Sequence, residues 1–129
     1  MSPVFGSFIA VGAGAAIGAW LRWGLSLWLN PHVQKFPMGT LAANLIGGFL
    51  VGLAVAYFAK NPDLSPEWRL FVITGFLGGL TTFSSYSAEV VGLLERGDIV
   101  PALVVAFTHL AGSFALTALG FWTYRALAN

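Results

Sequence analysis

The sequence predicts an all-α integral membrane protein with four transmembrane helices, the third of which is broken near the membrane midplane. Of the 129 residues, 57% are hydrophobic and 9% are charged, whereas a soluble domain has about 25% charged residues. Four apolar segments, each long enough to cross a bilayer, are separated by short polar loops. We expect a single transmembrane domain over residues 1–129, with spans at 4–29, 38–60, 67–96 and 98–126.

The first span, residues 4–29, is too long and too poor in N-terminal charge for a cleavable signal peptide, so we expect a retained helix. Gly14 and Gly18 stand four apart in it, a spacing that lets another helix approach closely. Arg22 has two possible roles: it extends toward the interface, or it raises the positive potential at an anion entrance. His32, in the loop that follows, is expected to be solvated.

The second span, residues 38–60, has a small and polar face. Thr40, Asn44, Gly48 and Gly52 recur every four residues and therefore share one side of a helix. Asn44 carries the only side-chain amide within a predicted span. It either forms a hydrogen bond between helices or lines a pore as a neutral donor suited to an anion.

The third span, residues 67–96, contains the predicted break, at 78–82. Ser65 is suited to cap its start, with Pro66 as the first helical residue. Two glycines at 78 and 79 are then followed by six hydroxyl-bearing residues among the seven at 81–87. Glycine loosens a helix, and Ser and Thr compete for its backbone hydrogen bonds. Non-helical backbone persists at membrane depth only where protein or a water-filled cavity covers it.

Ionisable groups within the spans are few. Glu89 is the only acidic residue expected inside a span, and an intramembrane carboxylate is a functional hypothesis by default. Because a bare carboxylate would repel an anion, we expect Glu89 to be neutral or turned aside in an anion pathway.

In the fourth span, residues 98–126, His109, Ser113 and Thr117 are spaced by four and share a face. His109 either forms a hydrogen bond between helices or lines the pathway.

The remaining polar groups suit transport of a small anion better than catalysis. Ring edges at Phe83 and Tyr86 are electropositive, although plain packing would also explain them. Together with hydroxyls and an amide they suit a small, hard, strongly hydrated anion. Glu89 and His109 alone do not make a catalytic or metal centre, so no enzyme is expected. A net charge of +1 argues against nucleic acid as a partner. The neutral donors are Asn44, Ser84, Ser87, Ser113 and Thr117.

The basic residues divide evenly between the two predicted sides of the membrane. Asymmetry in Lys and Arg normally fixes orientation, so an even division favours insertion both ways and an antiparallel homodimer. Lys60, Arg69 and Arg125 lie on the side of the termini, and Arg22, Lys35 and Arg96 lie on the other.

The stretch at 78–87, Gly-Gly-Leu-Thr-Thr-Phe-Ser-Ser-Tyr-Ser, resembles the signature of the Fluc (CrcB-like) family of bacterial fluoride channels. Further matches are Leu-Arg-Trp at 21–23, Gly-Thr-Leu-x-x-Asn at 39–44 and His-x-x-Gly-Ser at 109–113. The resemblance covers essentially the whole chain in order. Tyr86 departs from it, because the family usually has phenylalanine there; we expect its hydroxyl to bond a neighbour or water and its ring edge to face the ion.

The resemblance implies a passive fluoride-selective channel in the bacterial plasma (inner) membrane that releases cytoplasmic fluoride. It implies a dual-topology antiparallel homodimer with two pores, and a structural sodium ion held by the backbone carbonyls of Gly78 and Thr81. A proton-coupled small multidrug exporter is the alternative, but it would want a carboxylate in the first span, which has none. A non-transporting helical scaffold would not need a hydroxyl-rich break.

Overall fold

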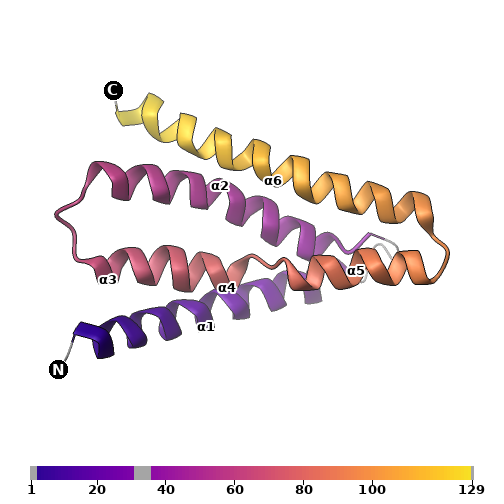
Figure 1. The fold of residues 1–129 in the computed structure, drawn as a ribbon, viewed down its shortest axis with the longest axis horizontal. Helices are drawn as coiled ribbons and strands as arrows, with labels where there is room; N and C mark the ends of the chain where they lie inside the picture. The colour runs from indigo at the N-terminus through magenta and orange to yellow at the C-terminus, as the bar shows by residue number, and fades with distance from the viewer. Residues whose placement is uncertain (1–2, 31–35, 129) are drawn as a thin grey trace.

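The computed structural model describes residues 3–30 and 36–128, so His32 and Lys35 lie outside the described residues. Three long helices, α1 (Pro3–Leu29), α2 (Met38–Lys60) and α6 (Ile99–Ala128), run beside one discontinuous helix. The start of α1 and the end of α6 lie at the same end of the molecule (Figure 1).

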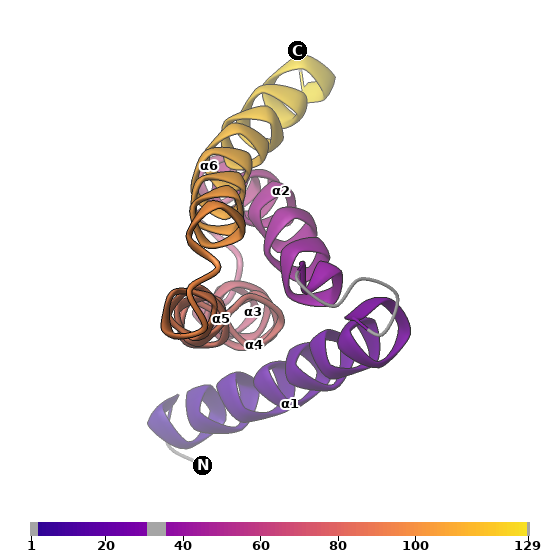
Figure 2. The ribbon, with the colours of Figure 1, turned by 90° about the vertical axis from the view of Figure 1, so that its right-hand side faces the viewer.

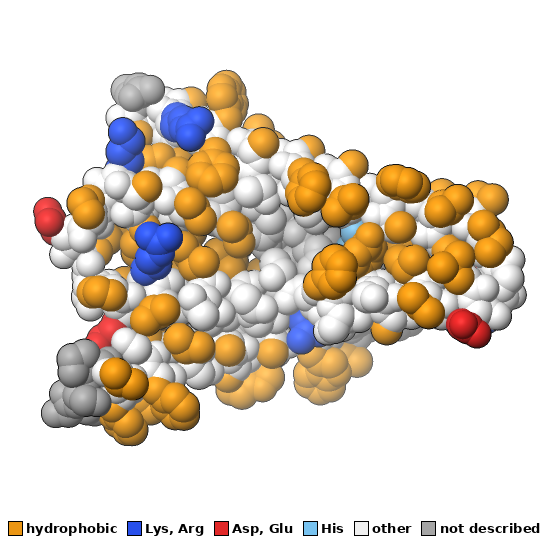
Figure 3. All heavy atoms as spheres, viewed as in Figure 1, with side chains coloured by type: hydrophobic (Ala, Val, Ile, Leu, Met, Phe, Trp, Pro, Cys, Tyr) orange, Lys and Arg blue, Asp and Glu red, His pale blue; other side chains and the backbone are white. Residues whose placement is uncertain are grey.

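Within the described residues, α1, α2 and α6 are long and apolar enough to cross a membrane, with mean hydropathies of 1.8, 1.9 and 1.9. Many of their large side chains face outward, including Trp20, Phe107 and Trp122. Hydrophobic groups cover much of the face shown in Figure 3, and the charged groups on it gather mainly toward the two ends. This confirms the multi-pass membrane protein expected from composition.

The discontinuous helix corresponds to the predicted third span. It consists of α3 (Pro66–Arg69), a π-helix (Leu70–Leu77), α4 (Gly78–Leu80) and α5 (Ser84–Glu95). Its start is capped as expected, because the Glu67 amide donates to Ser65 Oγ at 3.3 Å and Pro66 is the first residue. The π-helix was not predicted. Such helices are rare and usually a single turn.

The break lies later than the sequence suggested. Both glycines of the pair are helical and belong to α4, whereas Thr81 is extended with φ −88° and ψ 157° and the helix resumes only at Ser84. The glycine pair is therefore not the point of interruption. Gly79 serves contact with α1, because a Cβ there would overlap the carbonyl oxygen of Ala15.

Helix α1 packs on the first half of the discontinuous helix through backbone contacts (Figure 2). A Cβ on Gly14 or Gly18 would overlap the carbonyl oxygen of Phe71 or Phe76, respectively. This confirms the close helix approach expected from that spacing. A Cβ on Gly12, in contrast, would have no neighbour within 4 Å.

Helix α6 packs on α2 and α5. Gly52 and Gly120 face each other across the α2–α6 contact, where a Cβ on either would overlap backbone. Against α5, a small core gathers Leu93, Ala102 and Val105. These contacts hold α2, α5 and α6 around the break.

Candidate functional site

Asn44 on α2 holds both backbone groups of Thr82 in the break. Its Oδ1 accepts from the Thr82 amide at 2.8 Å, and its Nδ2 donates to the Thr82 carbonyl at 3.0 Å. Nδ2 also lies 3.0 Å from Nδ1 of His109 on α6. Both Asn44 and His109 are buried. The hydrogen bond between helices, one of the two roles open for Asn44, is therefore present and reaches three elements.

Hydroxyl groups add to or replace helical hydrogen bonds around the break, since the Leu77 carbonyl also keeps its bond from the Thr81 amide. Thr81 Oγ1 donates to the Leu77 carbonyl at 2.8 Å, and Thr82 Oγ1 accepts from the Ser85 amide at 3.1 Å. Thr82 thereby satisfies one of the free amides at the start of α5, as a capping side chain does. The density of hydroxyls in this stretch has a structural use independent of any ion.

The aromatic residues after the break form a stack with His109. Phe83 and Tyr86 meet edge to face, with ring centroids 5.5 Å apart and planes at 76°. Tyr86 in turn stacks on His109, at 4.4 Å and 23°. The Tyr86 hydroxyl donates to the Ala106 carbonyl at 2.8 Å, which confirms that this hydroxyl finds a partner. Phe83 remains 75% exposed.

An open groove of about 380 Å³ runs along the break. Its wall comes from α2, the break, α5 and α6, and among the described residues it includes no Lys, Arg, Asp or Glu. The residues predicted to line the fluoride pathway that meet in this wall are Asn44, Phe83, Tyr86, His109 and Ser113. Thr81, predicted as a sodium ligand, also lies in the wall, whereas Gly78 does not.

The four other residues predicted for the fluoride pathway lie outside the wall of this groove. Thr117 Oγ1 donates to the Gly48 carbonyl at 3.0 Å and so joins α6 to α2. Ser84 is exposed, with its Oγ 3.4 Å from Thr82 Oγ1, and Ser87 is half-buried. Glu89 accepts from Thr40 Oγ1 at 2.6 Å, and its other oxygen is buried without a hydrogen-bond partner in the described structure.

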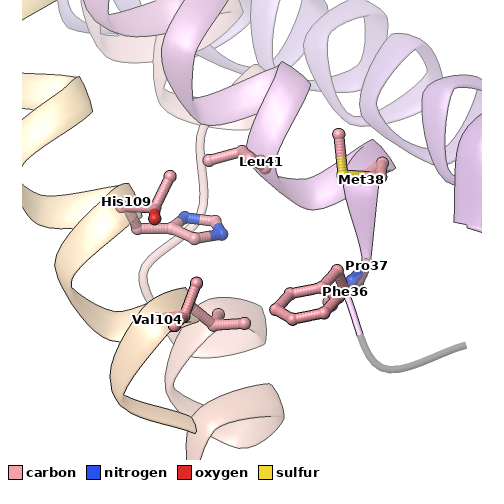
Figure 4. A pocket seen from close by; sticks show the side chains of 8 residues that line it. Phe36, Pro37, Met38, Leu41, Val104 and His109 are labelled. Carbon is pink, nitrogen blue, oxygen red and sulfur yellow. The ribbon is translucent and has the colours of Figure 1, made fainter. Parts of the chain in front are cut away.

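Two further features at the site were not foreseen. Arg22 Nε donates to the Gly79 carbonyl at 3.1 Å, so Arg22 lies against α4 just before the break. Its charge is placed at the C-terminal, negative end of the first half-helix. A second cavity, of about 180 Å³, is lined mainly by apolar side chains and also by His109 (Figure 4). The periodicity of the sequence carried no signal for either feature.

Comparisons with known proteins agree with this architecture. The model of the family described as CrcB-like protein, Camphor Resistance (CrcB), matches residues 9–121. The chain is 61% identical to the fluoride-specific ion channel FluC of Thiobacillus denitrificans over 121 residues, which is 94% of this chain and 98% of that protein. It is 60% identical to the protein of the same name from Cupriavidus pinatubonensis, over 99% of this chain and 100% of that protein. The FluC protein of Burkholderia pseudomallei is 58% identical, over 95% and 96%. The chain belongs to the CrcB-like family.

Proposed function

We propose that this chain forms a fluoride-selective channel through which fluoride leaves the cytoplasm passively, down its gradient, giving resistance to fluoride. The observation that carries the proposal is the groove at the break. Asn44, Phe83, Tyr86 and Ser113 share its wall without a fixed charge. Relatives about 60% identical over nearly their whole length are named fluoride-specific ion channels.

The chemistry of the groove suits conduction. An ion must lose water on entering and must still be able to leave, so neutral donors serve better than a cation that would hold it. The Ser113 hydroxyl and the positive edges of the Phe83 and Tyr86 rings are such groups. The stack on His109 and the bond to Ala106 fix the plane of the Tyr86 ring.

The direct test is fluoride efflux from liposomes that contain the purified protein, followed with a fluoride electrode and compared with chloride efflux. A channel predicts fast fluoride release that needs no proton gradient. A requirement for an imposed proton gradient would favour the exporter instead, although the described part of α1 carries no carboxylate. Absence of any fluoride release would refute the channel function.

We further infer that the discontinuous helix also crosses the membrane, which gives four spans, and that two chains pair in antiparallel orientation in the bacterial inner membrane. The outward-facing apolar side chains and the family membership support this inference. The bond from Arg22 to the Gly79 carbonyl weakens the charge argument, because it gives Arg22 a structural role just before the break. A C-terminal tag probed from each side of the membrane should label roughly equal populations; a one-sided result would contradict the dimer.

A sodium ion held by the Gly78 and Thr81 carbonyls is the remaining proposal, and the donor set fits a hard cation. In a continuous helix these carbonyls would accept from the amides of Thr82 and Ser85. Those amides instead donate to Asn44 Oδ1 and Thr82 Oγ1, which favours free carbonyl oxygens. Gly78→Val should damage assembly, and Thr81→Val should be milder because the ligand is backbone. Equal and severe loss would implicate the hydroxyl instead.

A further inference from the structure

We propose that His109 is a positioning residue for Asn44. In its neutral form it accepts a hydrogen bond through Nδ1, which fixes the direction of the Asn44 amide. Through Asn44 it holds the break in the geometry that lines the groove. The proposal deepens the channel function and rests on it for the flux measurement below, but not for the exchange measurement.

The direction of the Asn44 amide is determined by Thr82. A backbone N–H can only donate and a carbonyl oxygen can only accept. The Asn44 atom that lies 2.8 Å from the Thr82 nitrogen is therefore the oxygen, and the atom 3.0 Å from the Thr82 carbonyl is the nitrogen. Exchanging the two would break both contacts, so the geometry permits only one orientation.

The tautomer of His109 follows from this orientation. Asn44 Nδ2 carries only donors, so Nδ1 of His109, 3.0 Å away, must be the acceptor and carries no proton. The proton of the neutral ring is then on Nε2. Figure 4 shows the imidazole projecting from α6 into the second cavity. Stacking against Tyr86 at 4.4 Å restrains the ring in this position.

Protonation of His109 would reverse this interaction. Both ring nitrogens of an imidazolium are donors, so Nδ1–H would face the Nδ2 hydrogens of Asn44. To escape this conflict, the amide must turn and give up its bonds to Thr82. The break would then lose the contact that holds its extended backbone beside the groove.

The charged and titratable groups around His109 define the controls. On α5, Tyr86 stacks on the ring while its hydroxyl donates to the Ala106 carbonyl. Glu89, also on α5, bonds Thr40, one turn before Asn44 on α2. Arg22 from α1 bonds Gly79 ahead of the break. Glu89 is therefore the other group whose titration must be separated from that of His109.

The first experiment measures hydrogen–deuterium exchange of the Thr82 amide in lipid nanodiscs, which requires no ion flux. His109→Asn places an oxygen where Nδ1 lies, whereas His109→Gln places its oxygen near Nε2; both remove the ring. We expect exchange within about threefold of wild type in His109→Asn and at least about tenfold faster in His109→Gln, because a broken hydrogen bond raises the open population. Similar exchange in both variants would overturn the proposal.

The second experiment measures fluoride flux between about pH 8 and about pH 5, the range in which imidazole titrates, with leakage from protein-free liposomes subtracted. Wild type should lose at least about tenfold of its flux on acidification, and His109→Asn should lose much less. His32→Gln, which alters the only other histidine, and Glu89→Gln should keep the wild-type profile.

Two flux results would overturn the proposal: a wild-type flux independent of pH, or the same acid-linked loss in His109→Asn. A wild-type protein without fluoride flux at any pH would refute the channel function instead. The exchange of Thr82 would still test the role of His109 in that case.

Discussion

The two halves of the discontinuous helix are held in different ways. The half before the break, α3 through α4, lies against α1 through backbone contacts at Gly14, Gly18 and Gly79. The half after the break, α5, is held by side chains: the Tyr86 hydroxyl reaches Ala106, and Leu93 packs into a core with α6. The first half is held by backbone contacts with α1, and the second is held by side chains, some of which also line the groove.

The half of the discontinuous helix that packs on α1 is therefore distinct from the half that lines the groove. Every residue of the third segment that lines the groove lies at or after Thr81. The glycine contacts place the end of α4, and Asn44 then sets where the chain resumes. Damage to the first half should therefore lower folding, whereas damage to the second should lower flux in a folded protein.

The largest effect is expected from Gly18→Val. Its side chain would overlap the Phe76 carbonyl, which is backbone and cannot rotate away. Overpacking of this kind costs about 1–3 kcal/mol and occasionally more, so we expect little monodisperse protein after purification. Gly12→Val on the same helix meets nothing within 4 Å and should purify normally. Equal yields from the two variants would show that the α1 contact is not close.

A large effect on flux, with normal folding, is expected from Phe83→Ile and Tyr86→Ile. Each substitution removes an aromatic edge from the groove wall. We expect the fluoride efflux rate in liposomes to fall by more than about tenfold, or about 1.4 kcal/mol in barrier. The loss at Phe83 should be at least as large as at Tyr86. Efflux that survives both changes would mean that the rings serve packing alone.

A smaller effect is expected from Tyr86→Phe. The ring, its stack on His109 and its edge are kept, and only the hydroxyl that bonds the Ala106 carbonyl is lost. One neutral hydrogen bond contributes about 0.5–1.5 kcal/mol, so efflux should stay within about tenfold of wild type. A greater loss, measured beside Tyr86→Ile, would assign the hydroxyl a direct part in conduction.

The smallest effect is expected from Thr117→Val. Its hydroxyl donates to the Gly48 carbonyl and lies outside the groove wall, so the change should lower stability by about 1 kcal/mol and leave efflux within about twofold. Thermal unfolding and efflux can be measured on the same preparation. Ser113→Ala, in the groove wall one turn earlier, should reduce efflux more; the reverse order would place the pathway along Thr117.

Much of this arrangement could be predicted from the sequence, because residues four apart share a helix face. That rule placed Asn44 with Gly48 on the packed side of α2, and His109 with Ser113 on α6. It could not give the partner of Asn44, since a bond to Thr82 depends on the fold. Of the predicted break at 78–82, residues 81 and 82 are non-helical but the glycine pair is helical. Glycine permits close helix contact as well as a break, and composition does not distinguish these uses.

The π-helix could not be foreseen for a related reason. Leu70–Leu77 is apolar apart from Thr74 and Gly75. It therefore has too few polar residues for their spacing to distinguish a π-helix from an α-helix. Arg22 was also ambiguous, because the sequence allowed either an extension toward the interface or a role at an anion entrance. The bond from Arg22 to the Gly79 carbonyl depends on how α1 packs against α4, and the sequence does not reveal that packing.

The π-helix also affects where the chain should tolerate the loss of a residue. Its hydrogen bonds close on the fifth residue rather than the fourth, so it stores residues that an α-helix over the same rise would not need. Removing one residue from this segment would let it rewind toward α-helical pitch while Gly78 and the break keep their positions, although it would shift Phe71 relative to its contact with Gly14. Removing one residue from 81–83 would instead pull Thr82 away from Asn44. The chain should therefore tolerate a shortened segment before the break far better than a shortened break.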